Sequence, residues 1–120
     1  MITFYGYDRC STCRKAQQWL REHGIASTPV DITTNPPPKR VLEAILRSGR
    51  YQLGELFNRS GEAYRALGLS QRLKTLTQAQ ALELLADNGR LVKRPIITDG
   101  SRHTVGFDPR RLAEVWTAPD

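Results

Sequence analysis

The two cysteines of the chain, Cys10 and Cys13, form a Cys-X-X-Cys pair and are the groups best suited to chemistry. Such a pair can form a disulfide, bind a metal or lie unused in a core. A disulfide across two residues closes too small a loop to stabilise a fold much, so a bridge here would matter for its chemistry. Structural zinc normally needs four ligands, and the histidines, His23 and His103, do not match the spacing of a known site. We therefore predict thiol redox chemistry and no metal.

The segments around the pair predict how it is presented. Residues 2–6 are β-branched and aromatic and indicate a short buried strand, and a loop over residues 7–9 then leads to Cys10. From Ser11 the apolar spacing predicts a helix that ends at Gly24. The first turn of a helix offers free backbone N–H groups and a positive dipole end, which lower the pKa of a thiol there.

The charges beside Cys10 act in both directions. Arg9 and Arg14 favour its thiolate, whereas the carboxylate of Asp8 disfavours it. We expect Cys10 to be the exposed cysteine that attacks, and Cys13, one turn further along the helix, to be more buried and to act as the resolving thiol.

The remaining pattern predicts an α/β fold. Residues 25–32 indicate a second strand parallel to the first, which places both sulfurs at the carboxyl end of the sheet. The chain ends in a hairpin with Asp99-Gly100 at its turn, followed by a helix that starts at Asp108-Pro109. Between these halves we expect three helices: the stripe from Val41 to Leu46, a short one ended by Gly68, and one opened by a Thr77–Gln80 capping box that stops at Asn88-Gly89.

The strand-helix-strand and strand-strand-helix halves together predict a thioredoxin-like fold with a four-stranded mixed sheet. We expect one domain over residues 1–120, with a helical insertion at about 38–88. Trp19 and Trp116 fall on apolar helix faces and are expected in the core, and His23 and His103 are expected at the surface or at the boundary of the core.

Composition bounds the function. The 120 residues are enough for one domain, and 39% of them are hydrophobic, which can fill a core without disulfides. Eighteen basic against twelve acidic side chains give a net charge of +6, which favours anionic partners, but the basic residues are scattered and do not indicate nucleic-acid binding. The chain has no apolar stretch that could span a membrane and no secretory signal, so we expect a cytoplasmic protein.

Several segments resemble the arsenate reductase (ArsC) family, in the family's order and over nearly the whole chain. They are Cys10-Ser11-Thr12-Cys13-Arg14-Lys15-Ala16, Asn35-Pro36-Pro37, Asn58-Arg59-Ser60, the segment from Ala63 to Leu69, and Lys93-Arg94-Pro95-Ile96-Ile97. The Cys-X-X-Cys members of the family, which include Spx-type regulators, are also similar in Val105-Gly106-Phe107.

The resemblance implies a role for each matching position. In the family, the cysteine at the helix start attacks arsenate and forms a thiol–arsenate adduct, which implies that Cys10 is the nucleophile. Two family arginines that hold the oxyanion correspond to Arg59 and Arg94, and Pro95 corresponds to the cis-proline that follows. Guanidinium groups suit this task because their N–H groups match oxyanion oxygens in pairs.

The rest of the oxyanion site is expected at the helix start, with Ser11, Thr12 and Arg14 as substrate-binding residues. A third family arginine falls on Gly106 here, which leaves two alternatives: Arg102 or Arg14 substitutes for it, or arsenate binding is weak.

The resemblance also bears on the reductant. The glutaredoxin-linked family enzymes carry serine where this chain has Cys13, and they depend on glutathione. Here Cys13 can instead release arsenite from the adduct and leave a Cys10–Cys13 disulfide, which thioredoxin or glutaredoxin would reduce. We expect no tightly bound cofactor, and arsenate, arsenite and the reductant protein as partners.

Two other functions stay open at this point. One is a Spx-type transcription regulator that binds RNA polymerase and uses the cysteine pair as a redox switch, an idea that the net charge of +6 supports. The other is a glutathione-dependent reductase of a different substrate, which the missing third arginine supports. The sequence leaves the electron donor and the oligomeric state open.

Overall fold

The computed structural model describes residues 1–117, and their contacts divide the chain into two compact units. The first unit contains residues 1–31 and the segment from Arg94 onward, and the second contains residues 32–93. The cysteine pair belongs to the first unit. No helix within residues 1–117 is long and apolar enough to cross a membrane.

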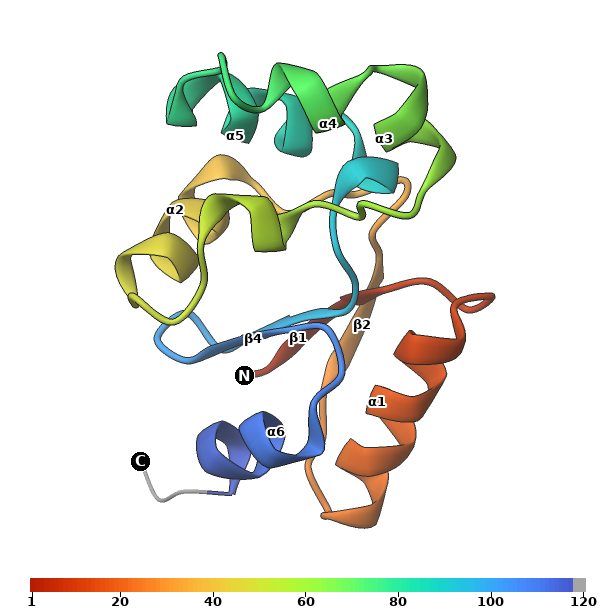
Figure 1. The fold of residues 1–120 in the computed structure, drawn as a ribbon. Helices are drawn as coiled ribbons and strands as arrows, with labels where there is room; N and C mark the ends of the chain where they lie inside the picture. Colours follow the sequence, from red (N-terminus) through yellow and green to blue (C-terminus); the bar gives the residue numbers. More distant parts are fainter. Residues whose placement is uncertain (118–120) are drawn as a thin grey trace. The chain divides into compact units, whose positions relative to one another are not determined.

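The first unit is built on a four-stranded mixed sheet with the strand order β2-β1-β3-β4. Strand β1 (Thr3–Gly6) is parallel to β2 (Thr28–Asp31) and antiparallel to β3 (Ile96–Thr98), which pairs antiparallel with β4 (His103–Val105). Helices α1 (Ser11–Glu22) and α6 (Pro109–Trp116) lie on the same side of this sheet (Figure 1). This arrangement confirms the predicted thioredoxin-like fold.

The core of the first unit fills the space between the two helices and the sheet. Trp19 of α1 and Trp116 of α6 are both in it, as predicted, together with Phe4 from β1 and Ile97 from β3. The indole N–H of Trp116 donates to the Thr104 hydroxyl (3.0 Å), so its polar edge is satisfied inside the core.

The two histidines have different surroundings. His23 is exposed at the end of α1, as predicted, where its ring stacks on Trp19. The prediction that His103 lies at the surface or at the boundary of the core is wrong, since His103 is only 7% exposed on β4. Its ring nitrogen is hydrogen-bonded to the hydroxyl of Thr98 (2.7 Å), the residue opposite it on β3, and this partner offsets the cost of burying an imidazole.

Local signals account for the ends of the elements. Gly24 follows α1 with a φ of +67°, a backbone conformation that favours glycine. Asp108 caps α6 by accepting hydrogen bonds from the N–H groups of Arg110 and Arg111, with Pro109 in the first turn. Both ends were predicted from residue type alone.

The second unit is helical. Its longer helices are α2 (Lys39–Arg47) and α5 (Gln78–Asp87), and α3 (Glu62–Ala66) is short. All three were predicted, as was the Thr77–Gln80 capping box that opens α5. The structure adds three very short helices, which are η1 (Leu53–Leu56), α4 (Leu69–Arg72) and η2 (Gly89–Leu91). Elements of three or four residues are too short to show a helical period in the sequence.

A first prediction concerns Gly89, which is buried at the start of η2. A Cβ atom at this position would overlap the backbone carbonyl of Ile32, which cannot move as a side-chain end can. We expect Gly89→Ala to destabilise the protein by at least about 2 kcal/mol, measured by urea denaturation. Gly24→Ala is the control because a Cβ there meets nothing within 4 Å, so only its positive φ should cost about 1 kcal/mol. Equal losses in the two variants would contradict the steric explanation.

A second prediction concerns Asp99 in the hairpin turn. Burial works to raise its pKa, but hydrogen bonds from the N–H groups of Arg102 and Ser101 and the ion pair with Arg102 (2.8 Å) outweigh burial and lower the pKa to about 2. Since the folded pKa lies below the usual value of 3.8, the stabilisation is present above that value and is lost as the pH falls through the folded pKa. Between about pH 5 and pH 2, wild type should lose about 1 to 2 kcal/mol more unfolding free energy than Asp99→Asn. Parallel losses in urea denaturation would contradict this.

Candidate functional site

Cys10 is the residue that caps the N-terminus of α1. Its backbone is extended, its N–H donates to the Tyr7 carbonyl (3.0 Å), and its sulfur accepts a hydrogen bond from the Cys13 N–H (3.3 Å). The first hydrogen bond inside the helix runs from the Arg14 N–H to the Cys10 carbonyl (3.0 Å). The sulfur therefore occupies the place of the usual serine or aspartate cap, where N–H groups favour a negative charge.

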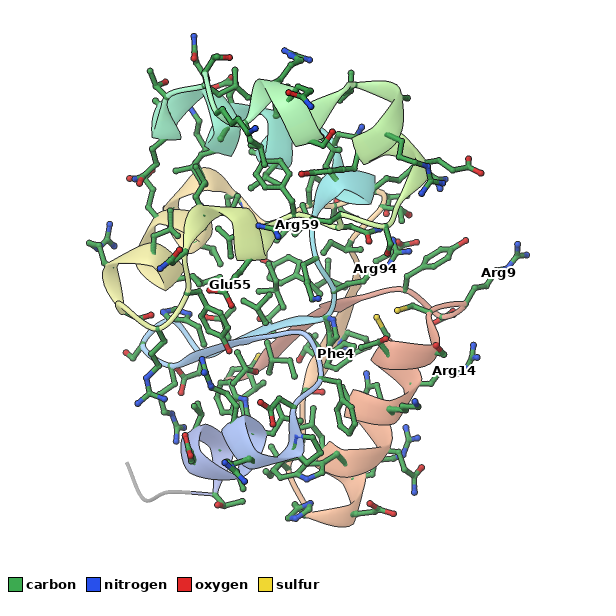
Figure 2. All side chains as sticks on the ribbon, viewed as in Figure 1. Phe4, Arg9, Arg14, Glu55, Arg59 and Arg94 are labelled. Carbon is green, nitrogen blue, oxygen red and sulfur yellow. The ribbon has the colours of Figure 1, made fainter. Side chains whose placement is uncertain are left out.

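Arg94 supplies the positive charge beside this sulfur. Burial of Cys10 by itself raises its pKa, but hydrogen bonds from the Cys13 thiol and N–H, together with the hydrogen bond and charge of Arg94, outweigh burial and lower the pKa. In Figure 2, Arg94 lies beside the turn that carries the two sulfur atoms, whereas Arg9 and Arg14 extend away from it. The arginine that lowers the pKa of Cys10 is therefore Arg94, which is far from Cys10 in the sequence, and not the neighbouring Arg9 or Arg14.

The pKa of Cys13 is shifted in the opposite direction. It is 3% exposed, and burial is the largest cause that raises its pKa to about 12, followed by the hydrogen bond that its thiol donates to Cys10. Gly6 at the end of β1 leaves room for this sulfur, because a Cβ there would lie 3.3 Å from it and would overlap the Phe4 ring. The pair therefore consists of a half-buried Cys10 whose pKa is lowered and a buried Cys13 whose pKa is raised, which is the difference in burial that we predicted. The roles of attacking and resolving thiol stay a prediction.

Pro95 follows Arg94 at the start of β3. The Arg94–Pro95 peptide bond is cis, as predicted, and the Pro95 ring is buried. The Pro95 carbonyl accepts a hydrogen bond from the Gly106 N–H (2.8 Å), which ties the segment before β3 to the segment after β4. The structure therefore brings Cys10, Cys13, Arg94 and Pro95 together at the carboxyl end of β1.

The other predicted residues at the helix start have different positions. Ser11 is exposed and Thr12 half-buried in the first turn of α1, and their N–H groups precede the first hydrogen bond inside the helix. Arg14 is exposed and donates to the Asp8 carbonyl (2.9 Å), so it closes the loop that leads to Cys10. A direct role for Ser11, Thr12 and Arg14 in binding substrate stays a prediction.

Arg102 does not replace the third family arginine. It is paired with Asp99, donates to the Val115 carbonyl (3.3 Å), and lies over the Trp116 ring (5.2 Å to its centroid). Arg102 comes just after the end of β3, where Thr98 pairs with Thr3 at the start of β1. Cys10 follows the other end of β1. This expectation was wrong because the strand register, which the sequence does not show, places Arg102 at the far end of the sheet.

Gly106, the position onto which the third family arginine falls, is buried and has a φ of +78°. Side chains rarely adopt this backbone conformation, so the segment before α6 favours glycine here. The departure from the family pattern is therefore a feature of the local backbone.

Arg59 lies in the second unit, between η1 and α3. It is exposed, and its Nε donates to the Gly54 carbonyl (3.2 Å). Gly54 has no side chain, and a Cβ there would overlap the Arg59 guanidinium. The proposed contact of Arg59 with substrate stays a prediction.

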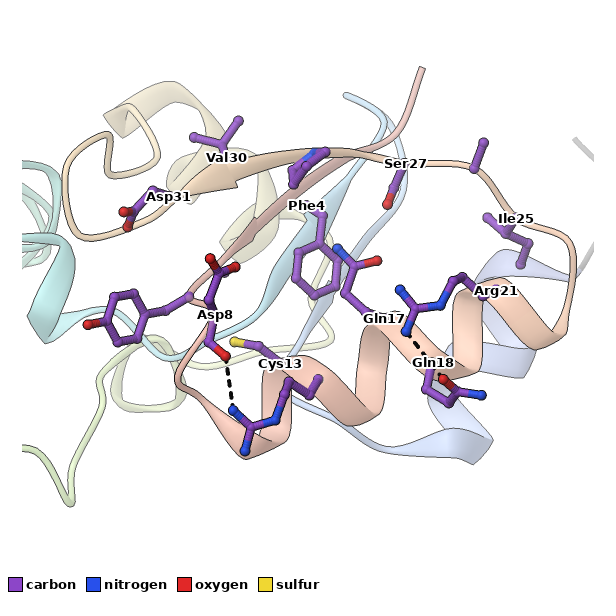
Figure 3. A pocket seen from close by; sticks show the side chains of 15 residues that line it. Phe4, Asp8, Cys13, Gln17, Gln18, Arg21, Ile25, Ser27, Val30 and Asp31 are labelled. Atoms are coloured by element: carbon purple, nitrogen blue, oxygen red, sulfur yellow. Dashed lines mark hydrogen bonds between the residues drawn. The ribbon is translucent and has the colours of Figure 1, made fainter.

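An open cavity of about 920 Å³ lies between α1 and β2 (Figure 3). Phe4 and Cys13 border it on the inside, Gln17 and Arg21 line it from α1, and Val30 lines it from β2. Cys10 is not among its lining residues. The cavity thus borders Cys13 and does not reach Cys10.

The comparisons with known proteins identify the family of this chain. The sequence model of the ArsC family matches residues 5–115. The chain belongs to the ArsC family. The match includes all four residues that the structure brings together at the cysteine pair.

The similar proteins include an uncharacterized protein, a transcriptional regulator and a possible arsenate reductase. The chain is 44% identical to the uncharacterized protein YusI of Bacillus subtilis, over 96% of this chain and 98% of that protein. It is 32% identical to the global transcriptional regulator Spx of Listeria monocytogenes, over 90% of this chain and 81% of that protein. A solved structure described as a possible arsenate reductase from Streptococcus mutans matches with a TM-score of 0.83 and 38% identity, over 89% of this chain and 91% of that chain.

Sequence reasoning missed one residue of the site. Tyr7 was interpreted only as part of a loop, yet its carbonyl accepts the Cys10 N–H and its ring lies under the Arg94 guanidinium, with 5.6 Å between the ring centroid and Cζ. No local signal marks Tyr7, because its contact with Arg94 depends on the pairing of β1 with β3.

A third prediction tests the electrostatic support of Cys10. Replacing Arg94 by glutamine removes a hydrogen bond and a positive charge from the thiolate, so the pKa of Cys10 should rise by about 0.5 to 1 unit. At a pH below the pKa of the wild-type thiol, alkylation by iodoacetamide should slow by about 3- to 10-fold, and the difference should vanish above the pKa of both proteins, where Cys10 is fully ionised.

The matched control is Lys15→Gln, which removes one positive charge from the exposed side of α1. It should leave the pKa of Cys10 unchanged, as measured by the thiolate absorbance near 240 nm. A similar shift in both variants would show that net charge, and not the Arg94 contact, sets the reactivity.

Proposed function

We propose that this protein is an arsenate reductase that uses Cys10 as its nucleophile and Cys13 as its resolving thiol. The observation that carries the proposal is the pairing of a thiolate-favouring Cys10 with the Arg94 guanidinium at a helix N-terminus. A tetrahedral oxyanion that approaches a thiolate needs positive charge and N–H donors to offset the repulsion between two anions, and this site provides both. Membership of the ArsC family and the likeness to a possible arsenate reductase support the same chemistry.

In the first step, the Cys10 thiolate attacks the arsenic atom of arsenate. A sulfur–arsenic bond forms, one arsenic–oxygen bond breaks, and the oxygen leaves as water after it takes up protons. Arsenic stays in its +5 state in the adduct. Arg94 and the N–H groups of Ser11 and Thr12 are the proposed contacts of the arsenate oxygens, with Arg14 and Arg59 as further cations.

In the second step, the Cys13 sulfur attacks the Cys10 sulfur. The sulfur–sulfur bond forms while the sulfur–arsenic bond breaks, and its electron pair moves to arsenic, which leaves as arsenite in the +3 state. The two thiols are thereby oxidised to one disulfide, which balances the two electrons that arsenic gains. The Cys13 proton passes to arsenite or to water.

The high pKa of Cys13 fits this order of events. Part of the rise comes from the hydrogen bond and charge of the Cys10 sulfur, and this contribution requires a thiolate at Cys10. Formation of the adduct consumes that thiolate, so the pKa of Cys13 falls when its nucleophilic form is needed. Cys13 therefore stays protonated until the adduct exists.

The Cys10–Cys13 disulfide has to be reduced by an external protein before the next turnover. We propose thioredoxin or glutaredoxin with glutathione as the electron donor, in a cytoplasmic role in arsenic detoxification. Cys10 is the half-buried, more accessible sulfur of the pair and is the one that the reductant would attack.

A fourth prediction tests the function. Arsenate-dependent oxidation of NADPH should occur when the protein is coupled to thioredoxin and thioredoxin reductase, or to glutathione, glutaredoxin and glutathione reductase. Cys10→Ser should abolish turnover in both systems because no adduct forms. Cys13→Ser should abolish turnover with thioredoxin alone, since the adduct then has no internal thiol to resolve it.

Two results would contradict the proposal. If the wild-type protein shows no arsenate turnover in either coupled system, the proposed arsenate reductase activity is wrong. If Cys13→Ser keeps the wild-type rate of thioredoxin-coupled turnover, Cys13 is not the resolving thiol.

A redox-sensing regulator is the second candidate, and the likeness to the transcriptional regulator Spx favours it. In that function the same Cys10–Cys13 disulfide would serve as a switch and RNA polymerase would be the partner. Co-purification with RNA polymerase that depends on the oxidation state of the cysteine pair would support it. Polymerase binding without arsenate turnover would decide in its favour.

A further inference from the structure

Tyr7 connects the three functional groups of the site. Its N–H donates a hydrogen bond to the Cys13 sulfur, its carbonyl accepts the N–H of Cys10 (3.0 Å), and its ring lies 5.6 Å from the Arg94 guanidinium carbon. The main-chain contacts are available to any residue at this position. The ring contact depends on the aromatic side chain.

The ring contact holds Arg94 without using its hydrogen-bond donors. A guanidinium stacks on an aromatic ring through its flat face, so the N–H groups around its edge stay available. A carboxylate partner would occupy those donors and cancel the charge. Within the first unit, over residues 1–31 and 94–117, no carboxylate forms an ion pair with Arg94.

We propose that Tyr7 is a positioning residue that holds the Arg94 guanidinium beside Cys10 through its ring face. The N–H edge of Arg94 then faces the Cys10 sulfur in the resting protein. During the reaction it would face the oxyanion, and this statement about the oxyanion rests on the proposed function. Tyr7 acts through Arg94 and makes no bond to the reacting sulfur with its own side chain.

The test measures the reactivity of Cys10 without arsenate. In a Cys13→Ser background, where no disulfide can form, we compare Tyr7→Leu and Tyr7→Phe by iodoacetamide alkylation and by titration of the thiolate absorbance. Tyr7→Leu should slow alkylation, at a pH below the pKa of Cys10, by about 2- to 3-fold and raise the pKa of Cys10 by about 0.3 to 0.5 unit. Tyr7→Phe keeps the ring face and should restore wild-type reactivity.

A double-mutant cycle separates positioning from a general structural effect. If Tyr7 acts through Arg94, Tyr7→Leu should have no further effect on the pKa in a protein that already carries Arg94→Gln. An equal effect of Tyr7→Leu with and without Arg94, or an unchanged pKa in Tyr7→Leu alone, would overturn the proposal.

A further variant keeps the test decisive if Tyr7→Leu folds poorly. Pentafluorophenylalanine at position 7 has nearly the shape of phenylalanine but a ring face of reversed charge, so it should repel the guanidinium and raise the pKa of Cys10. A pKa equal to that of Tyr7→Phe would overturn the proposal. These measurements need no arsenate, so their outcome does not depend on whether the protein is an arsenate reductase.

Discussion

The lowered pKa of the Cys10 thiol is the feature on which the candidate site depends. Burial alone would keep this thiol protonated, and three kinds of contact reverse that tendency: the helix N–H groups, the Cys13 thiol and the Arg94 guanidinium. The first two come from Cys13 in the first turn of α1, and the third comes from the segment before β3. The strand β1 ends where the loop turns into α1, and the segment before β3 brings Arg94 to the same place. The sheet thus serves chiefly to assemble charges around one sulfur atom.

The two cysteines share this environment but respond to it differently. Cys13 is one turn further into the helix and packs in the space left by Gly6, so burial dominates its pKa, whereas the cap position of Cys10 gives its sulfur an N–H donor. Their hydrogen bond also couples them, because the charge on one raises the pKa of the other. The lowered pKa of Cys10 and the raised pKa of Cys13 suit a reaction in which Cys10 attacks first and Cys13 attacks in a later step. The same difference also suits a switch between dithiol and disulfide states, so the arrangement is compatible with both the possible arsenate reductase and the transcriptional regulator among the similar proteins.

Arginine contributes to this unit in two contrasting ways. Arg102 is paired with a carboxylate, stacked on Trp116 and bonded to a carbonyl, so its donors and charge serve the hairpin and α6. Arg94 lies over the Tyr7 ring and contributes a hydrogen bond and a positive charge to the Cys10 sulfur. The two arginines thus differ in the groups that they contact, and residue type alone does not reveal this difference.

The sequence by itself determined the fold class, the order of the elements and the identity of the cysteine pair. These follow from local signals, such as the apolar spacing of α1, the caps at Thr77 and Asp108 and the turn at Asp99-Gly100, whose physical effects act within a few residues. Arg94 and Pro95 were found only through the family resemblance, and Tyr7 was not found at all. The tertiary structure decided that Arg94 supports the thiolate, that Arg102 lies at the far end of the sheet and that His103 is buried. Those outcomes depend on strand register and on contacts between residues that are distant in the chain, which local propensity does not encode.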